Sequence, residues 1–233
     1  MRMKLSIILV LSFVAMISTV PDTPVLKYLV REPGIKSAHP PMLILLHGYG
    51  SNEQDLFSFA NSLPAKYLII SARAPITLEA DSYAWYQLEY AADKPVSNIE
   101  QEAKSRQLII QFIGQLQEKY AVDASEIYLC GFSQGAIMSY SIALTRPDLV
   151  KGIAAMSGRL LEEVKPQIAA PEKLKKLQIF ISHGTYDNTL PFQYSKSADS
   201  YLQSRGIRPV FKQYPAGHEI NAQMLHDLVN WLK

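Results

Sequence analysis

The sequence predicts an α/β fold in which helices cover both faces of a mostly parallel central sheet. Short apolar runs alternate with longer segments of helical periodicity along the 233-residue chain, and this order requires parallel strands joined by helical crossovers. The run 42–46 is apolar throughout, which is typical of a strand that is buried on both faces. The chain length suits one domain with a large core, so we expect a single domain over 21–233 and no separate cap domain.

The predicted elements follow one another in a regular order. Seven short apolar runs are expected to be strands: 26–30, 42–46, 67–71, 127–130, 153–156, 179–182 and 210–214. Five segments are expected to be helices: 53–62, 99–120, 134–145, 192–205 and 222–233. In the longest of them, Leu108, Phe112, Leu116 and Tyr120 recur every four residues and form one apolar stripe. In such sheets, functional residues gather in the loops beyond the carboxyl ends of the strands.

The composition excludes several classes of protein. Apolar residues make up 48% of the chain and charged residues 19%, as in globular proteins and unlike disordered ones. The formal net charge is only +2, and no dense block of Lys and Arg occurs, so we expect no nucleic-acid partner. The one cysteine, Cys130, cannot form an intrachain disulfide, and no zinc-type Cys/His spacing is present. We interpret Cys130 as a small core residue.

The N-terminus has the pattern of an export signal. Two basic residues precede the apolar run 5–20, and Pro21 follows it, which predicts a signal peptide over 1–20. The run is shorter than a membrane-spanning helix and contains serines, so we expect no membrane span in the mature chain. We therefore expect a periplasmic or secreted protein. The alternatives are an uncleaved anchor, or a cytoplasmic protein whose chain starts at Met16.

The segment 131–135 has the pattern Gly-x-Ser-x-Gly, with Ser133 at its centre. It lies between the predicted strand 127–130 and the predicted helix 134–145, where a sharp turn lifts the serine hydroxyl above the sheet. The two glycines are needed because the strand and helix backbones pass close to this strained turn. The dipole of the following helix favours negative charge beside the hydroxyl. Ser133 is therefore the candidate nucleophile.

A serine nucleophile needs a base, and the base needs a carboxylate that holds its tautomer. Of the five histidines, His218 lies in a glycine-containing loop between the last predicted strand and the last predicted helix. Asp187 lies in the loop just past the carboxyl end of the predicted strand 179–182. The resulting chain order of Ser133, Asp187 and His218 is typical of α/β-hydrolases. We predict that these three residues form a catalytic triad.

Such a site also needs two backbone N–H groups for the oxyanion. The residue after the nucleophile, Gln134, supplies one of them. The loop after the predicted strand 42–46 contains two glycines that let its backbone approach a substrate, and the N–H of Tyr49 is the candidate for the second donor. The alternative is that His47 and Gly48 only make a tight turn.

Four motifs occur in a fixed order along the chain: Leu46-His-Gly-x-Gly50, Gly131-Phe-Ser-Gln-Gly-Ala136, His183-Gly-x-x-Asp187-x-x-Leu-Pro191 and Gly217-His-Glu-Ile220. Together they resemble the phospholipase/carboxylesterase family, the acyl-protein-thioesterase-like α/β-hydrolases, over residues 26–233. The resemblance implies a hydrolase without a metal or an organic cofactor that cleaves carboxylic esters, lysophospholipids or acyl thioesters. One departure is Tyr49, where the thioesterase branch usually has leucine. The oxyanion donor is a backbone group, so this departure changes only the wall of the acyl pocket.

An aromatic stretch follows the third predicted strand. Leu78, Trp85 and Tyr86 are candidates for a wall that contacts the acyl or alcohol group of the substrate. The alternative is ordinary packing of a loop against the sheet.

These features favour a carboxylesterase- or phospholipase-type serine hydrolase that acts on a small-molecule or lipid-like ester through an acyl-serine intermediate. Two alternatives stay open. The first is an exported acyl or feruloyl esterase that acts on polysaccharide-linked esters. The second is a hydrolase-fold protein that binds a ligand without cleaving it.

Overall fold

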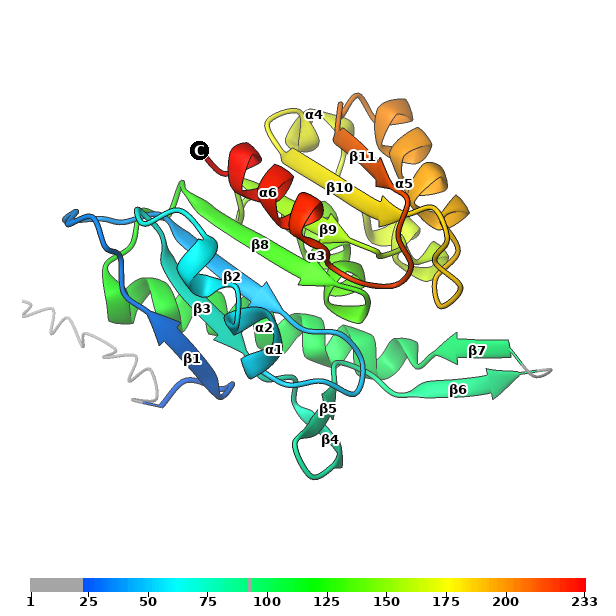
Figure 1. Ribbon diagram of the computed structural model, residues 1–233, viewed down its shortest axis with the longest axis horizontal. Helices are drawn as coiled ribbons and strands as arrows, with labels where there is room; N and C mark the ends of the chain where they lie inside the picture. The colour runs from blue at the N-terminus through cyan, green and yellow to red at the C-terminus, as the bar shows by residue number, and fades with distance from the viewer. Residues whose placement is uncertain (1–22, 92–93) are drawn as a thin grey trace, which may run out of the picture.

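The computed structural model of the protein describes residues 23–91 and 94–233. The signal peptide predicted over 1–20 lies outside the described residues. Seven strands form the central sheet, in the spatial order β1-β3-β2-β8-β9-β10-β11 (Figure 1). They are β1 (Tyr28–Arg31), β2 (Met42–Leu46), β3 (Leu68–Ala72), β8 (Ile127–Phe132), β9 (Gly152–Met156), β10 (Gln178–Gly184) and β11 (Val210–Tyr214).

The sheet has the predicted, mostly parallel arrangement. β1 is antiparallel to β3, and all other neighbouring strands in it are parallel. β8 lies between β2 and β9, so the chain segments that leave these three strands emerge side by side at one edge. The loops that carry His47, Ser133 and Ser157 therefore start next to one another.

Helices cover both faces of the sheet, as the sequence predicts. They are α1 (Gln54–Phe57), α2 (Ile99–Tyr120), α3 (Gln134–Thr145), α4 (Pro171–Leu174), α5 (Gln193–Ser204) and α6 (Ala222–Trp231). Met42, Ile44 and Leu46 pack with buried residues of α2, α3, α4 and α5 on one face, whereas Leu43 and Leu45 pack with those of α1 and α6 on the other. This alternation is the two-residue period of a strand, and it explains why the run 42–46 is apolar throughout.

The predicted helix over 53–62 is wrong in its extent. The segment forms α1 and then a separate 3₁₀ turn, η1 (Ala60–Ser62). The Ser58 hydroxyl donates to the carbonyl oxygen of Asp55 at 2.6 Å, and such local bonds compete with the regular helical ladder. The other predicted helices agree with the structure to within two residues at each end.

Two β-hairpins occupy the stretch between β3 and α2, where the sequence suggested only an aromatic wall. They consist of β4 (Ile76–Glu79) with β5 (Ser82–Ala84), and of β6 (Leu88–Ala91) with β7 (Lys94–Ser97). Both extend away from the central sheet (Figure 1). A second 3₁₀ turn, η2 (Glu162–Gln167), follows β9. No helix in the described part of the chain has the length and hydropathy that a membrane crossing requires.

Candidate active site

Ser133 lies on a strained turn between β8 and α3. Its backbone has φ 54° and ψ −116°, a left-handed conformation that non-glycine residues rarely adopt and that often marks a functional site. A Cβ atom at Gly135 would lie 1.9 Å from the Leu46 carbonyl oxygen, and one at Gly131 would lie 2.2 Å from the Gly135 backbone. The turn therefore closes only with glycine at both positions, for the steric reason that the sequence suggested.

Ser133, His218 and Asp187 form one hydrogen-bonded chain. The Ser133 hydroxyl lies 2.9 Å from His218 Nε2, and His218 Nδ1 lies 2.7 Å from Asp187 Oδ2. Backbone bonds hold the two loops together: the N–H of Thr185 donates to the Tyr214 carbonyl at 2.7 Å, and the N–H of Tyr186 to the Ala216 carbonyl at 3.0 Å. Three residues from distant parts of the sequence thus have the geometry that moves a proton from a hydroxyl to an imidazole.

The Asp187 carboxylate is buried and held in place by its own loop. Its Oδ1 accepts hydrogen bonds from the backbone N–H groups of Thr189 at 2.9 Å and Leu190 at 2.8 Å. Its Oδ2 faces His218 and also lies 3.2 Å from His183 Nε2. Because Oδ1 is occupied by two donors, the carboxylate presents a fixed oxygen to His218.

His183, at the end of β10, is a second histidine beside the carboxylate, and the sequence analysis assigned it no role. It is fully buried. Its Nε2 lies 2.7 Å from the Leu190 carbonyl oxygen, which can only accept, so Nε2 carries the proton. Its Nδ1 is in hydrogen-bond contact with the Ser195 hydroxyl. Burial lowers the pKa of His183 below its ordinary value, so the ring is neutral and positions Asp187 and the 187–190 loop.

The lowered pKa of His183 predicts a loss of stability in mild acid. The unfolded chain has an ordinary histidine pKa of about 6.5, and the folded pKa is lower. The unfolded state therefore takes up the proton first as the pH falls below about 6.5, and the free energy of unfolding decreases by at most about 1.4 kcal/mol per pH unit for this proton. We expect urea unfolding of H183Q between about pH 7.5 and pH 5 to give a shallower pH dependence than that of the wild type. The exposed His226 provides the control H226Q, and equal slopes for all three proteins would refute the prediction.

The loop after β2 is oriented by His47. This buried side chain donates through Nδ1 to the Gly48 carbonyl oxygen at 2.8 Å and accepts at Nε2 from the Ala74 N–H at 3.1 Å. A carbonyl and the next N–H of a peptide point in opposite directions, so this bond also fixes the direction of the Tyr49 N–H. Among the described residues, the N–H groups of Tyr49 and Gln134 have no protein acceptor. Both donors predicted for the oxyanion are thus available beside Ser133.

The Gln134 side chain links the turn at Ser133 to the segment before the second hairpin. It accepts from the Trp85 N–H at 2.8 Å and donates to the Tyr86 carbonyl oxygen at 2.7 Å. The Trp85 indole donates to the His47 carbonyl oxygen at 2.9 Å. Trp85 is therefore a buried brace, and neither it nor Leu78 of β4 lines the cavity beside Ser133. This corrects the prediction that both contact the substrate, whereas Tyr86 does lie in the cavity wall.

The cavity beside Ser133 has a volume of about 730 Å³. Ser133, His218, Gln134 and Tyr49 line it. Its further lining residues are Gly48, Ser51, Asp55, Tyr86, Leu88, Ser97, Phe132, Ile137, Arg159, Asn188, Thr189, Leu190, Pro191 and Tyr194. Within residues 23–91 and 94–233, no three His, Cys, Asp or Glu side chains gather as the ligands of a metal would.

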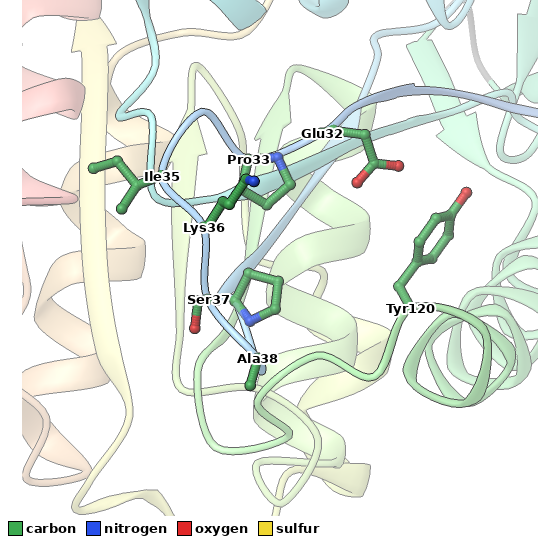
Figure 2. Close-up of a pocket in the computed structure, with 8 residues that line it drawn as sticks. Glu32, Pro33, Ile35, Lys36, Ser37, Ala38 and Tyr120 are labelled. Carbon is green, nitrogen blue, oxygen red and sulfur yellow. The ribbon is translucent and has the colours of Figure 1, made fainter.

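A separate hollow of about 490 Å³ lies between the loop after β1 and the end of α2 (Figure 2). Its titratable side chains are Glu32, Lys36 and Tyr120. None of the residues predicted for the active site lines it, and these three groups do not form a nucleophile–base pair. This hollow therefore lacks the groups for nucleophilic catalysis that line the cavity beside Ser133.

The fold and the site define the class of protein. A mostly parallel sheet flanked by helices, with a serine on the turn between a strand and a helix and a histidine after the last strand, is an α/β-hydrolase. The sequence profile of the phospholipase/carboxylesterase family matches residues 30–233. The chain belongs to this family, which places it among the carboxylesterase- and phospholipase-type hydrolases.

Individual relatives agree with this assignment. "Probable carboxylesterase SOBER1-like" of Arabidopsis thaliana is 34% identical over 48% of this chain, and the alignment spans only 43% of that relative. Carboxylesterase SOBER1 of the same plant is 28% identical over 82% of this chain and 89% of its own. The crystal structure of esterase PE8 superposes with a TM-score of 0.74 at 25% identity, covering 89% of this chain and 97% of that one.

Proposed function

We propose that this protein hydrolyses carboxylic esters by double displacement, with Ser133 as the nucleophile. The observation that carries the proposal is the hydrogen-bonded chain from the Ser133 hydroxyl through His218 to Asp187, at the wall of a cavity large enough for a small ester.

In the first half of the reaction, His218 Nε2 takes the hydroxyl proton while Ser133 Oγ attacks the acyl carbon. The oxyanion of the tetrahedral intermediate accepts hydrogen bonds from the N–H groups of Tyr49 and Gln134. The buried Asp187 carboxylate stabilises the positive charge on the imidazole. Collapse of the intermediate breaks the bond to the alcohol, which leaves with the proton from His218, and the acyl group stays on Ser133.

In the second half, a water molecule attacks the acyl-serine. His218 takes a proton from the water, and a second tetrahedral intermediate forms on the same two N–H groups. Its collapse releases the carboxylic acid and returns the proton to Ser133. The apolar side chains of Tyr86, Leu88 and Ile137 in the cavity wall suit an aliphatic or aromatic part of the ester.

The proposal is tested with the purified chain and a panel of esters. We expect burst kinetics and turnover with 4-nitrophenyl esters of short acyl groups, and stoichiometric labelling of Ser133 by a fluorophosphonate, located by peptide mass spectrometry. Long-chain, thioester and feruloyl substrates in the same panel define the preferred acyl group. A folded chain that hydrolyses none of these substrates and is not labelled would instead be a ligand-binding protein.

We also propose that the chain is exported, because a basic start followed by a short apolar run has the form of a signal peptide. Mass spectrometry of the N-terminus of the native protein tests this. A mature chain that begins near residue 21 supports export, and a chain that retains residues 1–20 contradicts cleavage.

A further inference from the structure

The catalytic cavity contains an arginine that the mechanism does not use. Apart from His218, the acidic and basic side chains that line it are Asp55 and Arg159. Asp55 is exposed and accepts a hydrogen bond from the Ser51 hydroxyl at 2.8 Å. Arg159 is half-buried, so its charge meets a more apolar environment than that of Asp55.

The backbone places Arg159 close to the nucleophile. It follows the carboxyl end of β9, directly beside β8, and the Ser133 N–H donates to the carbonyl oxygen of Met156 at 2.9 Å. A Cβ atom at Gly158 would lie 2.5 Å from the Ala136 Cβ, so the segment 157–159 passes tightly over the first turn of α3. Ser157 has φ 50°. Like Ser133, it is a non-glycine residue in a left-handed backbone conformation, which persists only where the surrounding structure enforces it. The backbone contacts of β9 and of the segment 157–159 with β8 and α3 therefore fix the position of Arg159 relative to Ser133.

The partners of the Arg159 guanidinium leave its charge without a counterion in the described part of the chain. One nitrogen donates to the Ser97 hydroxyl at 3.0 Å, and the group lies 5.6 Å from the centre of the Tyr194 ring. Three other arginines pair with a carboxylate, Arg73 with Glu53, Arg106 with Glu102 and Arg146 with Asp148. No described carboxylate pairs with Arg159 in this way.

A guanidinium has five N–H donors, so one neutral acceptor satisfies only a part of it. A half-buried charge gains most from an anion that also satisfies these donors, because the attraction is stronger where water is scarce. A carboxylate fits the planar fork of a guanidinium with two parallel hydrogen bonds. Arg159 thus has the properties of an anion-binding residue within the cavity beside Ser133.

We propose that Arg159 binds a carboxylate group of the substrate, so that the preferred esters carry a negative charge in their acyl or alcohol part. This inference rests on the proposed ester hydrolysis and names the substrate class of that site. The opposing explanation is that Arg159 only braces β7 through Ser97, in which case charged and neutral esters depend on it equally.

The test compares pairs of esters that differ in one carboxylate. For the acyl side, the pair is 4-nitrophenyl hydrogen glutarate and 4-nitrophenyl pentanoate. For the alcohol side, it is the butanoyl ester of 4-hydroxybutanoate and butyl butanoate, with the released acid measured by titration. The readout is the ratio of kcat/KM for the charged ester to that for the neutral ester. In R159M we expect this ratio to fall by about tenfold or more in one of the pairs, and in R159K to fall less because the charge remains.

The exposed Arg208 provides the matched control, because R208M changes the net charge equally and should leave both ratios as in the wild type. A ratio that falls in the glutarate pair places the subsite on the acyl side, and one that falls in the hydroxybutanoate pair places it on the alcohol side. If the wild type hydrolyses the esters but R159M changes neither ratio, Arg159 is a structural brace and the inference is wrong. If the wild type cleaves substrates of the panel above but neither charged ester, the inference is wrong, and if it cleaves no substrate of either set the proposed function itself fails.

Discussion

Replacement of Ser133 by alanine is expected to lower kcat for 4-nitrophenyl esters by at least about 10³-fold. The change removes the only atom that the mechanism places in a covalent bond with the acyl group. The oxyanion donors and the cavity remain, so a small residual rate over water is expected. The measurement is the steady-state kcat with a short-chain ester, together with loss of fluorophosphonate labelling.

The fold should tolerate this change, because alanine is smaller than serine and, among the described residues, the Ser133 side chain makes a hydrogen bond with His218 alone. Circular dichroism and urea unfolding of S133A are therefore expected to resemble those of the wild type. Cys130 lies three residues earlier but does not supply a replacement nucleophile. It is buried in the sheet, and burial raises the pKa of its thiol to about 12. Near-normal ester hydrolysis by folded S133A would exclude the proposed mechanism.

The parts of the site that the sequence predicted share one property. Ser133, Asp187 and His218 each lie in a loop that follows a strand, and such strands are readable as apolar runs. Parallel strands bring their carboxyl ends to one edge, so residues after different strands are expected to meet there. The structure brings His218 within hydrogen-bond distance of both Ser133 and Asp187. Arg159 also follows a strand, β9. The rule that residues after parallel strands meet at one edge, applied to the loop after 153–156, would have placed Arg159 beside the site as well.

The parts that sequence reasoning missed depend on contacts between distant residues. The sequence suggests that Trp85 is a substrate-binding aromatic. In the structure its backbone N–H donates to the Gln134 side chain and its indole N–H donates to the His47 carbonyl oxygen. No local pattern reveals bonds across 49 and 38 positions of the chain. The same holds for His183, since a histidine before a glycine at a strand end has no periodicity that marks it as a partner of Asp187. The two hairpins between β3 and α2 were missed because their three- or four-residue strands contain no continuous apolar run of the kind that marks the strands of the central sheet.

The buried Asp187 carboxylate is expected to influence kcat strongly although it does not contact the substrate, because it sets the tautomer of His218. The variant D187N tests this influence. Oδ1 of Asp187 accepts from the N–H groups of Thr189 and Leu190, so the oxygen of an asparagine amide must stay on that side. The NH₂ group then faces His218 Nδ1 and donates to it, which leaves the proton of the neutral ring on Nε2. In that tautomer Nε2 cannot accept the proton of Ser133. We expect kcat near neutral pH to fall by about 10⁴-fold, which is measured with the same ester as for S133A.

The variant D187A separates tautomer control from simple loss of the negative charge. Alanine also removes the carboxylate but donates no hydrogen bond, so the Nε2 lone pair of His218 stays accessible in one tautomer. If the proton position dominates, D187A should retain more activity than D187N, whereas equal losses would assign the effect to the missing charge. In both variants His183 loses its contact with Oδ2 of Asp187 but keeps its bond to the Leu190 carbonyl oxygen, so the 187–190 loop keeps one of its anchors. Activity of D187N within about tenfold of the wild type would mean that His218 is oriented by some group other than Asp187.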